Sequence, residues 1–249
     1  MHAESKWKPV NIVIDQGNTS AKVALFERKE LLNVFLFESL SQEALHEIII
    51  RNNVEMGILC AVKQVDVSVL SYLKSRLPVF FELDRQMRIP LNLDYRTPQT
   101  LGMDRIAAAT GAYMQQPEEN LLVIDAGTAI TFDFVDKNGC YKGGNISPGP
   151  GLRFKALHQF TGRLPLIDEQ GDLPALGYDT ATAIRSGVIT GIVREIDSYI
   201  EYYKKKYNVF TFLTGGYSFY FESKLKNPIF ADGNLVLRGL NEILNYQYA

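Results

Sequence analysis

The stretch Asn11-Ile-Val-Ile-Asp15-Gln-Gly17-Asn-Thr19 returns later in the chain as Leu121-Leu-Val-Ile-Asp125-Ala-Gly127-Thr128-Ala129. In both copies an apolar run ends in Asp-x-Gly, and a small residue with an amide or hydroxyl side chain follows. A second apolar run begins directly afterwards, as is typical of a β-hairpin whose tight connection needs a glycine. The repeat predicts a chain of two halves that begin with the same hairpin.

Each half then continues in the same order, from strands to helices. A third β-like run follows the hairpin at Leu31–Phe37 and at Gly139–Ile146, and apolar residues then recur at helical spacing. In the first half we expect helices at Gln42–Arg51, Val67–Arg76 and Leu101–Gln116, with strands at Met56–Val62 and Val79–Phe81 between them. In the second half we expect helices at Leu152–Phe160, Thr180–Tyr207 and Leu235–Tyr246, with a strand at Val209–Leu213.

A polar break, Gln115–Asn120, separates the two halves and is the expected domain boundary. The fold class predicted is α/β, with two domains, 1–117 and 118–249, facing a cleft. Two unrelated domains that share a hairpin by chance are the alternative.

The composition is that of a globular protein without a strong charge preference. The 249 residues are 46% hydrophobic, and 26 basic against 28 acidic side chains leave a net charge of −2. No basic field favours nucleic acid or an anionic membrane. The apolar runs are too short to cross a bilayer, and residues 1–10 hold no signal-peptide stretch. We expect a cytoplasmic protein in which Cys60 and Cys140 are small buried hydrophobes, not a disulfide or a metal site.

The two Asp-x-Gly turns are the best candidates for phosphate binding. A tight turn presents backbone N–H groups to phosphate oxygens, and a carboxylate at the strand end suits a phosphate-bridging Mg²⁺. A single copy is equally compatible with an ordinary Asx-turn. Two copies favour a polyphosphate ligand, since phosphoryl transfer depends on positioning and charge neutralisation. The chain has neither a P-loop motif nor a G-x-G-x-x-G motif.

Three further segments have both a functional and a structural interpretation. Asp104 in Gly102-Met-Asp-Arg105 is either a helix cap or a proton acceptor beside a substrate-binding arginine. The segments Gly143–Gly151 and Thr214-Gly-Gly216 either approach a ligand closely or are glycine-rich connections.

Taken together and in this order, the motifs resemble those of the type III pantothenate kinases, a branch of the actin-like (acetate and sugar kinase) superfamily with RNase H-like domains. The resemblance runs from residue 11 to about 240. Asp15–Thr19 and Asp125–Asp133 are similar to the family's two phosphate motifs, Gly102–Arg105 to its G-x-D-R motif and Gly143–Gly149 to its G-G-x-I-x-P-G segment. Thr214-Gly-Gly216 fits its adenosine region.

This resemblance implies ATP-dependent phosphorylation of pantothenate to 4′-phosphopantothenate, the first step of coenzyme A synthesis. It implies Mg²⁺ or another divalent cation, a monovalent cation (K⁺ or NH₄⁺) and a homodimer. Asp104 would be the general base, and the pantothenate site would comprise Tyr95, Gly102, Met103, Asp104, Arg105 and Thr180. ATP would be bound by Asp15, Gln16, Gly17, Asn18, Thr19, Ser20, Ala21, Lys22 and Thr128. Asp125 would lie near the monovalent cation, and Asp15 is a candidate ligand of the divalent cation. Met103 departs from the small residue of the family pattern, which affects pocket shape more than chemistry.

Two other classes of function remain open from the sequence. One is a different small-molecule kinase, or a phosphatase, of the same architecture. The other is a nucleotide-binding transcriptional accessory protein without kinase activity. Intact Asp15, Asp104 and Asp125 favour an enzyme.

Overall fold

The computed structural model describes residues 10–248, which form two compact units. One unit comprises the described residues up to Pro117 together with those from Asn234 onward, and the other is Glu118–Gly233. The strands of the first unit are β1 (Val10–Gln16), β2 (Ala21–Glu27), β3 (Glu30–Phe37), β4 (Val54–Ala61), β5 (Val79–Glu82) and the short β6 (Asn92–Leu93). Its helices are α1 (Gln42–Arg51), α2 (Val67–Arg76), a 3₁₀ turn (Pro98–Thr100), α3 (Met103–Gln115) and α7 (Leu235–Tyr246).

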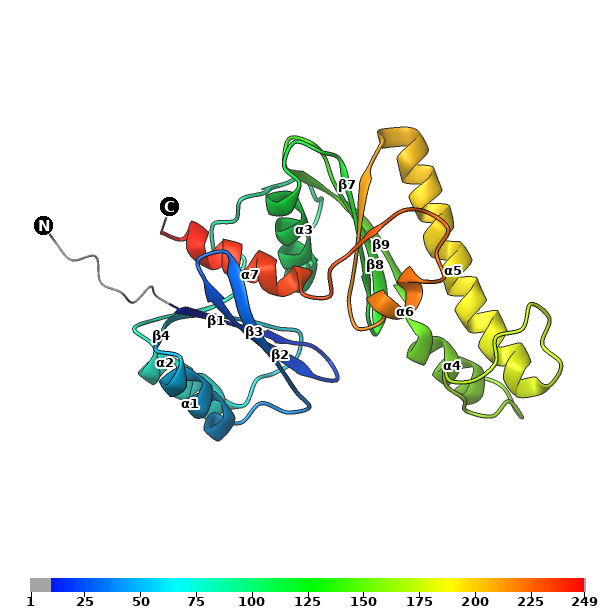
Figure 1. Cartoon of the computed structure of the whole chain (residues 1–249), viewed down its shortest axis with the longest axis horizontal. Coiled ribbons are helices and arrows are strands. Elements are labelled where there is room, and N and C mark those ends of the chain that lie inside the picture. The colour runs from blue at the N-terminus through cyan, green and yellow to red at the C-terminus, as the bar shows by residue number, and fades with distance from the viewer. Residues whose placement is uncertain (1–9, 249) are drawn as a thin grey trace, which may run out of the picture. The chain divides into compact units, whose positions relative to one another are not determined.

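The sheet of the first unit has the strand order β3-β2-β1-β4-β5. Figure 1 shows β1 to β4 of this sheet with helices α1 and α2. The first three strands pair antiparallel, and β4 and β5 add parallel to β1. Because successive side chains of a strand point to opposite faces, Ile12 and Ile14 pack in the core under α1 and α2. Asn11 lies on the other face, where its Nδ2 donates to Asn241 Oδ1 of α7 at 2.9 Å.

The second unit repeats this sheet. Its strands are β7 (Leu121–Ala126), β8 (Ala129–Val135), β9 (Cys140–Pro148), β10 (Phe210–Thr214) and β11 (Phe230–Ala231). They lie in the order β9-β8-β7-β10-β11, again three antiparallel strands followed by two that add parallel. The predicted pair of α/β halves with the same hairpin is therefore present.

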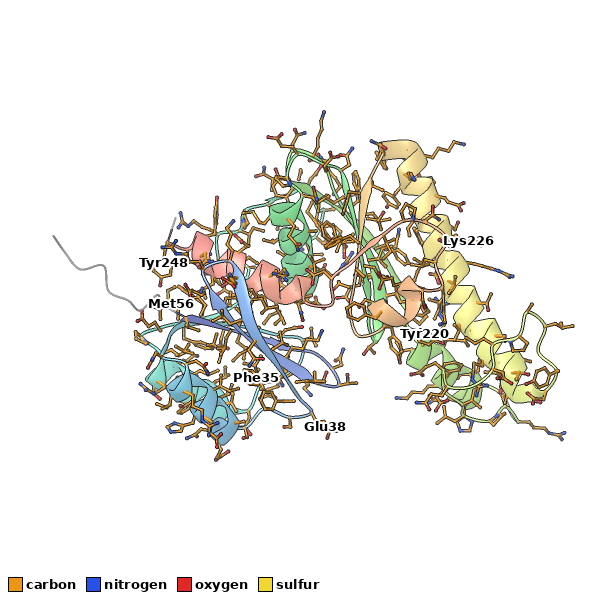
Figure 2. The ribbon with its side chains drawn as sticks, in the orientation of Figure 1. Phe35, Glu38, Met56, Tyr220, Lys226 and Tyr248 are labelled. Atoms are coloured by element: carbon orange, nitrogen blue, oxygen red, sulfur yellow. The ribbon has the colours of Figure 1, made fainter. Side chains whose placement is uncertain are left out.

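Helices cover one face of the second sheet: α4 (Pro150–Gln159), α5 (Thr180–Tyr207) and α6 (Ser218–Glu222). Figure 2 labels Tyr220, which belongs to α6. The 28-residue α5 begins at a capping box, in which Asp179 accepts from the Thr182 N–H, and ends at Asn208 in the left-handed region. Such caps satisfy N–H and C=O groups that a helix leaves unpaired at its ends.

Helix α7 follows the second unit in sequence but packs with the first. It crosses α3 so closely that neither helix has room for a side chain at its glycine. A Cβ at Gly239 of α7 would lie 1.8 Å from the Ala107 carbonyl oxygen, and a Cβ at Gly111 of α3 would lie 2.3 Å from the Leu235 carbonyl oxygen. Beyond the helix lies Tyr248, which is labelled in Figure 2. The centroid of its ring lies 6.4 Å from that of the Phe81 ring of β5. The predicted division, 1–117 and 118–249, groups this helix with the second half, and the structure differs because the two glycines let α7 dock on α3.

The remaining structural expectations concern the cysteines and the membrane. Both cysteines are free, and Cys60 is fully buried as expected, whereas Cys140 is half-buried. Within residues 10–248 no helix has the length and apolarity that a membrane span requires.

Candidate functional site

The first candidate element is the turn Gly17–Ser20 between β1 and β2. The Gly17 N–H donates to the Ser20 carbonyl at 3.0 Å, which closes the turn, and Asn18 and Thr19 are exposed at its tip. This geometry places small polar side chains and backbone at the edge of the sheet, as phosphate binding requires.

Asp15 lies just before this turn in an environment that disfavours its charge. It is paired with Lys22 across the hairpin and lies beside Cys60 of the parallel strand β4. Burial, together with the nearby negative charge of Asp104, raises its pKa from 3.8 to about 6, although Lys22 acts in the opposite direction. Burial and the same two carboxylates also raise the pKa of the Cys60 thiol. The site therefore holds two carboxylates close enough to interact electrostatically.

Asp104 is presented by the first turn of α3. Gly102 is the N-cap residue, and the Asp104 Oδ1 accepts a hydrogen bond from the Arg105 N–H at 2.9 Å. A Cβ at Gly102 would lie only 2.4 Å from that same oxygen, so the glycine makes room for the carboxylate. Asp104 thus accepts from one N–H that the helix leaves unpaired, which agrees with the interpretation as a helix cap. Its side chain is also partly exposed, which a proton acceptor for a substrate requires.

The other residues expected near substrate in the first unit differ in accessibility. Arg105 is buried, at 7% exposure, whereas Met103 and Tyr95 are half-buried. Tyr95 lies in the connection between β6 and the 3₁₀ turn.

Gln16 points to the opposite face of the sheet from Asp15. It is buried, and it lines a cavity of about 570 Å³ with residues of the loops that precede α1 and α2, among them Ser39, Lys63 and Asp66. Within residues 10–248, no group donates a hydrogen bond to its Oε1. Its backbone carbonyl accepts from the Val62 N–H at 3.0 Å. The side chain of Gln16 is therefore separated from the Asp15 carboxylate by the sheet.

The second candidate element is the turn Gly127–Thr128 between β7 and β8. The Gly127 N–H donates to the Ala129 carbonyl at 3.0 Å, and Thr128 is exposed. Asp125 lies opposite Thr131 in the hairpin, at the position that Asp15 has in the first unit.

Two glycine segments enclose this second turn. Gly215 has a φ of +91°, and a Cβ there would lie 2.3 Å from the Asp125 Oδ1 and 2.6 Å from the Ala126 carbonyl oxygen. Gly149 donates its N–H to the Thr128 carbonyl at 2.9 Å, and a Cβ there would lie 2.2 Å from the Gly127 carbonyl oxygen. Both glycine segments therefore pack closely on the Asp-x-Gly turn, where a side chain would not fit. Their expected approach to a ligand stays a prediction.

Thr180 is exposed as the first residue of α5. Directly before it, a Cβ at Gly177 would lie 2.4 Å from the Ala183 Cα, so this segment packs tightly on the first turn of the helix.

The donor set suits a phosphate-bound divalent cation. Mg²⁺ keeps several waters and takes only one or two protein carboxylates. Asp15 fits, because a cation would stabilise the ionised form that burial and Asp104 disfavour. Residues 10–248 contain no group of three His, Cys, Asp or Glu side chains that could hold a metal, so phosphates and water would complete the coordination.

One contact at the first turn was not anticipated from the sequence. The Lys63 Nζ donates to the Asn18 carbonyl at 3.3 Å. A sequence signal existed, because Lys63 lies two residues after the end of β4, and the carboxyl ends of parallel neighbours lie at one edge of a sheet.

Comparison with known proteins gives consistent results. A model of the type III pantothenate kinase family matches residues 11–202. A type III pantothenate kinase from Azobacteroides pseudotrichonymphae is 55% identical over 236 residues, which cover 95% of this chain and 96% of that protein. One from Bacteroides fragilis (strain YCH46) is 50% identical over 239 residues, which cover 95% and 98%.

Solved structures share the fold at lower identity. A Campylobacter jejuni protein assigned provisionally to the Baf family of transcriptional activators has a TM-score of 0.60 at 23% identity, covering 95% of this chain and 98% of that one. A ROK hexokinase from Thermus thermophilus has a TM-score of 0.51 at 15% identity, covering 96% and 100%. The prediction of an actin-like α/β kinase fold is confirmed by these likenesses and by the two matching sheets.

Proposed function

Because this chain belongs to the type III pantothenate kinase family, we propose that it transfers the γ-phosphoryl group of ATP to the hydroxyl group of pantothenate, the first step of coenzyme A biosynthesis. The observation that carries the proposal is 55% identity to a member of the family over 95% of the chain. The presence of both Asp-x-Gly turns and of Asp104 supports catalysis over mere nucleotide binding.

In this reaction Asp104 is the general base. The bond between the pantothenate oxygen and the γ-phosphorus forms as the bond from phosphorus to the ADP oxygen breaks, and the hydroxyl proton passes to the Asp104 carboxylate. In a loose transition state the proton leaves late, so a carboxylate suffices as base. The hydrogen bond from the Arg105 N–H to Oδ1 fixes the carboxylate orientation, which supports this assignment.

Substrate binding is assigned to the residues around Asp104 and to the start of α5. Tyr95, Gly102, Met103 and Arg105 are proposed to contact pantothenate, as is Thr180. Buried Arg105 supplies a fixed cation for the pantothenate carboxylate.

The phosphates of ATP are proposed to bind both Asp-x-Gly turns. In the first unit the ligands are Asp15 to Lys22, with Gln16 contributing through its backbone because its side chain faces away from Asp15. In the second unit the ligand is Thr128. A bound Mg²⁺ would neutralise charge on the phosphates, with Asp15 as its protein ligand. Asp125 is proposed to lie near a monovalent cation, because it belongs to the second Asp-x-Gly motif, at the position that Asp15 has in the first unit.

We further propose that the protein acts as a homodimer. Four large apolar side chains between α4 and α5 are exposed: Phe160 at 80%, Leu166 at 56%, Leu176 at 86% and Tyr178 at 68%. Exposed apolar side chains in one segment supply the kind of surface that protein contacts cover. Light scattering that gives a 28.1 kDa particle at micromolar concentration would contradict the proposal.

A substrate panel tests the function. Purified protein with Mg²⁺ and ATP is assayed for ADP release with pantothenate, with sugars, with acetate and with no acceptor. We expect turnover with pantothenate alone, together with a phosphorylated product detected by mass spectrometry. Turnover with a sugar would identify another kinase of this architecture. ATP binding without turnover on any acceptor would favour the regulatory alternative.

A further inference from the structure

Arg153 joins three segments of the second unit. It lies in the first turn of α4, and its Nε donates to the Pro148 carbonyl oxygen at 2.7 Å. One terminal nitrogen donates to the Ser147 hydroxyl oxygen at 2.8 Å and forms an ion pair with Glu195 of α5. The side chains of Arg153 and Glu195 are only 23% and 25% exposed, so solvent screens the pair incompletely.

The two residues that Arg153 holds form the end of β9, next to the second turn. Pro148 is paired with Ala129, and Ser147 with Ile130, at the start of β8. The next residue, Gly149, donates its N–H to the Thr128 carbonyl and packs without space for a side chain against the turn. Any movement of the Ser147–Gly149 segment is therefore transmitted directly to the backbone of Thr128.

Glu195 fixes the arginine from the opposite side. It lies in the middle of α5, whose buried face packs in the core of the unit through residues such as Ile192 and Ile196. A carboxylate on a rigid helix orients the planar guanidinium so that its other N–H groups point to Pro148 and Ser147. Successive contacts therefore connect α5 with the Gly127–Thr128 turn. Glu195 of α5 contacts Arg153, Arg153 contacts the end of β9, and Gly149 contacts the turn.

We propose that Arg153 and Glu195 are positioning residues for ATP, which hold the Thr128 turn in its phosphate-binding geometry by fixing the end of β9. The inference rests on the proposed function, in which Thr128 contacts ATP. Arg153 acts through geometry, because its Nε and one terminal nitrogen are engaged by Pro148, Ser147 and Glu195.

The expected effect is a selective loss of ATP affinity. Without the guanidinium, the Thr128 turn samples more conformations, and binding must order it again. For Arg153→Ala we expect the KM for ATP to rise about tenfold, the order of the loss when a hydrogen bond from a charged group is removed. The KM for pantothenate and kcat should change less than about twofold, since Thr180 is held by its own capping box.

Three further variants separate geometry from charge and from nonspecific damage. Arg153→Lys keeps the charge but not the planar fork, so its KM for ATP should remain close to that of Arg153→Ala. Glu195→Gln should raise the KM for ATP by a smaller factor, and adding it to Arg153→Ala should cause no further increase, because it acts only through the arginine. Lys155→Ala, at an exposed position of the same helix, is the matched control and should behave as wild type.

Hydrogen exchange supplies a readout that needs no ATP. The Gly149 amide, bonded to the Thr128 carbonyl, should exchange faster in Arg153→Ala than in Lys155→Ala, with amides in the centre of β7 unchanged. Full rescue by Arg153→Lys, or unchanged Gly149 exchange in Arg153→Ala, would overturn the inference. So would faster exchange with an unchanged KM for ATP. A wild-type protein inactive on pantothenate would instead refute the proposed function, and the exchange result would then still decide whether Arg153 holds the turn.

Discussion

Replacing Asp15 by Asn should make the free protein more stable at neutral pH, and the gain should disappear in acid. The folded state raises the pKa of this carboxyl above its value in the unfolded chain, so folding favours the protonated form. Stability from this group is fully present below the unfolded pKa of 3.8 and is lost as the pH rises to the folded pKa of about 6. Asn resembles the protonated form at every pH and avoids the loss.

The magnitude follows from the size of the shift. The change from 3.8 to about 6 is roughly two units, and each unit corresponds to about 1.4 kcal/mol. The upper limit is therefore about 3 kcal/mol at pH 8, and because Asp15 is partly exposed we expect a gain of about 1–2 kcal/mol. Most of the change in the stability difference should occur between pH 4 and pH 6, where the Asp15 carboxyl is ionised in the unfolded chain but protonated in the folded protein.

Urea unfolding of both proteins without nucleotide or divalent cation, at several values between pH 4.5 and pH 8, measures this difference. Glu55→Gln, at an exposed position of the neighbouring strand β4, is the control. We expect the free-energy gain of Asp15→Asn to grow up to about pH 6 and then level off. A gain that is the same at every pH, or a variant less stable than wild type at pH 8, would refute the proposed cause of the shift.

Three other changes test the site. Asp104→Asn should lower kcat for pantothenate about 10²- to 10⁴-fold, the usual worth of a general base, while ATP binding, measured by calorimetry, stays near wild type; near-normal turnover would leave Asp104 only a structural role. Removing K⁺ and NH₄⁺ from a Tris-buffered assay should slow phosphorylation, and equal rates with and without them would exclude a monovalent cation near Asp125. Gly149→Ala should cost about 1–3 kcal/mol in urea unfolding, because its Cβ would meet the Gly127 carbonyl oxygen at 2.2 Å, whereas at Gly151, where a Cβ meets nothing within 4 Å, the same change should be tolerated.

The secondary structure was largely predictable because local signals agree with the packing. The predicted bounds of α1, α2, α5 and α7 match the structure. Ser41, Asp66 and Asp179 each accept a hydrogen bond from the first turn of a helix, which is the physical reason that these boundaries can be read in the sequence. The two-residue strands β6 and β11 carry too few residues to show a period and were not predicted.

Long-range packing was not predictable from local patterns. The apolar period of α7 indicates a buried face but not its partner, and only the structure shows Gly239 against Ala107 of α3. The same holds for Arg153, whose partner Glu195 is distant in sequence and joined to it only by the fold.

The candidate site was predictable as motifs, and less so as side-chain directions. The motifs marked Gly149 and Gly215 as positions of close approach, but only the structure shows that both pack on the turn after Asp125. The period of two in a strand was sufficient to separate the side chains of Asp15 and Gln16, since neighbours in β1 point to opposite faces. The raised pKa of Asp15 depends on tertiary burial and on Asp104 of a distant segment, and no pattern within the strand shows it.

The docking of α7 on α3 has a consequence for how the protein is made. The unit that holds Asp15 and Asp104 is discontinuous in sequence, because Glu118–Gly233 is translated between α3 and α7. On the ribosome, Glu118–Gly233 can fold as soon as it emerges, whereas the first unit must wait for the helix that covers α3. During this interval the face of α3 that contains Ala107 and Gly111 is exposed. The nascent chain thus completes the packing around its proposed general base only after α7 has been synthesised, which delays activity until translation has passed this helix.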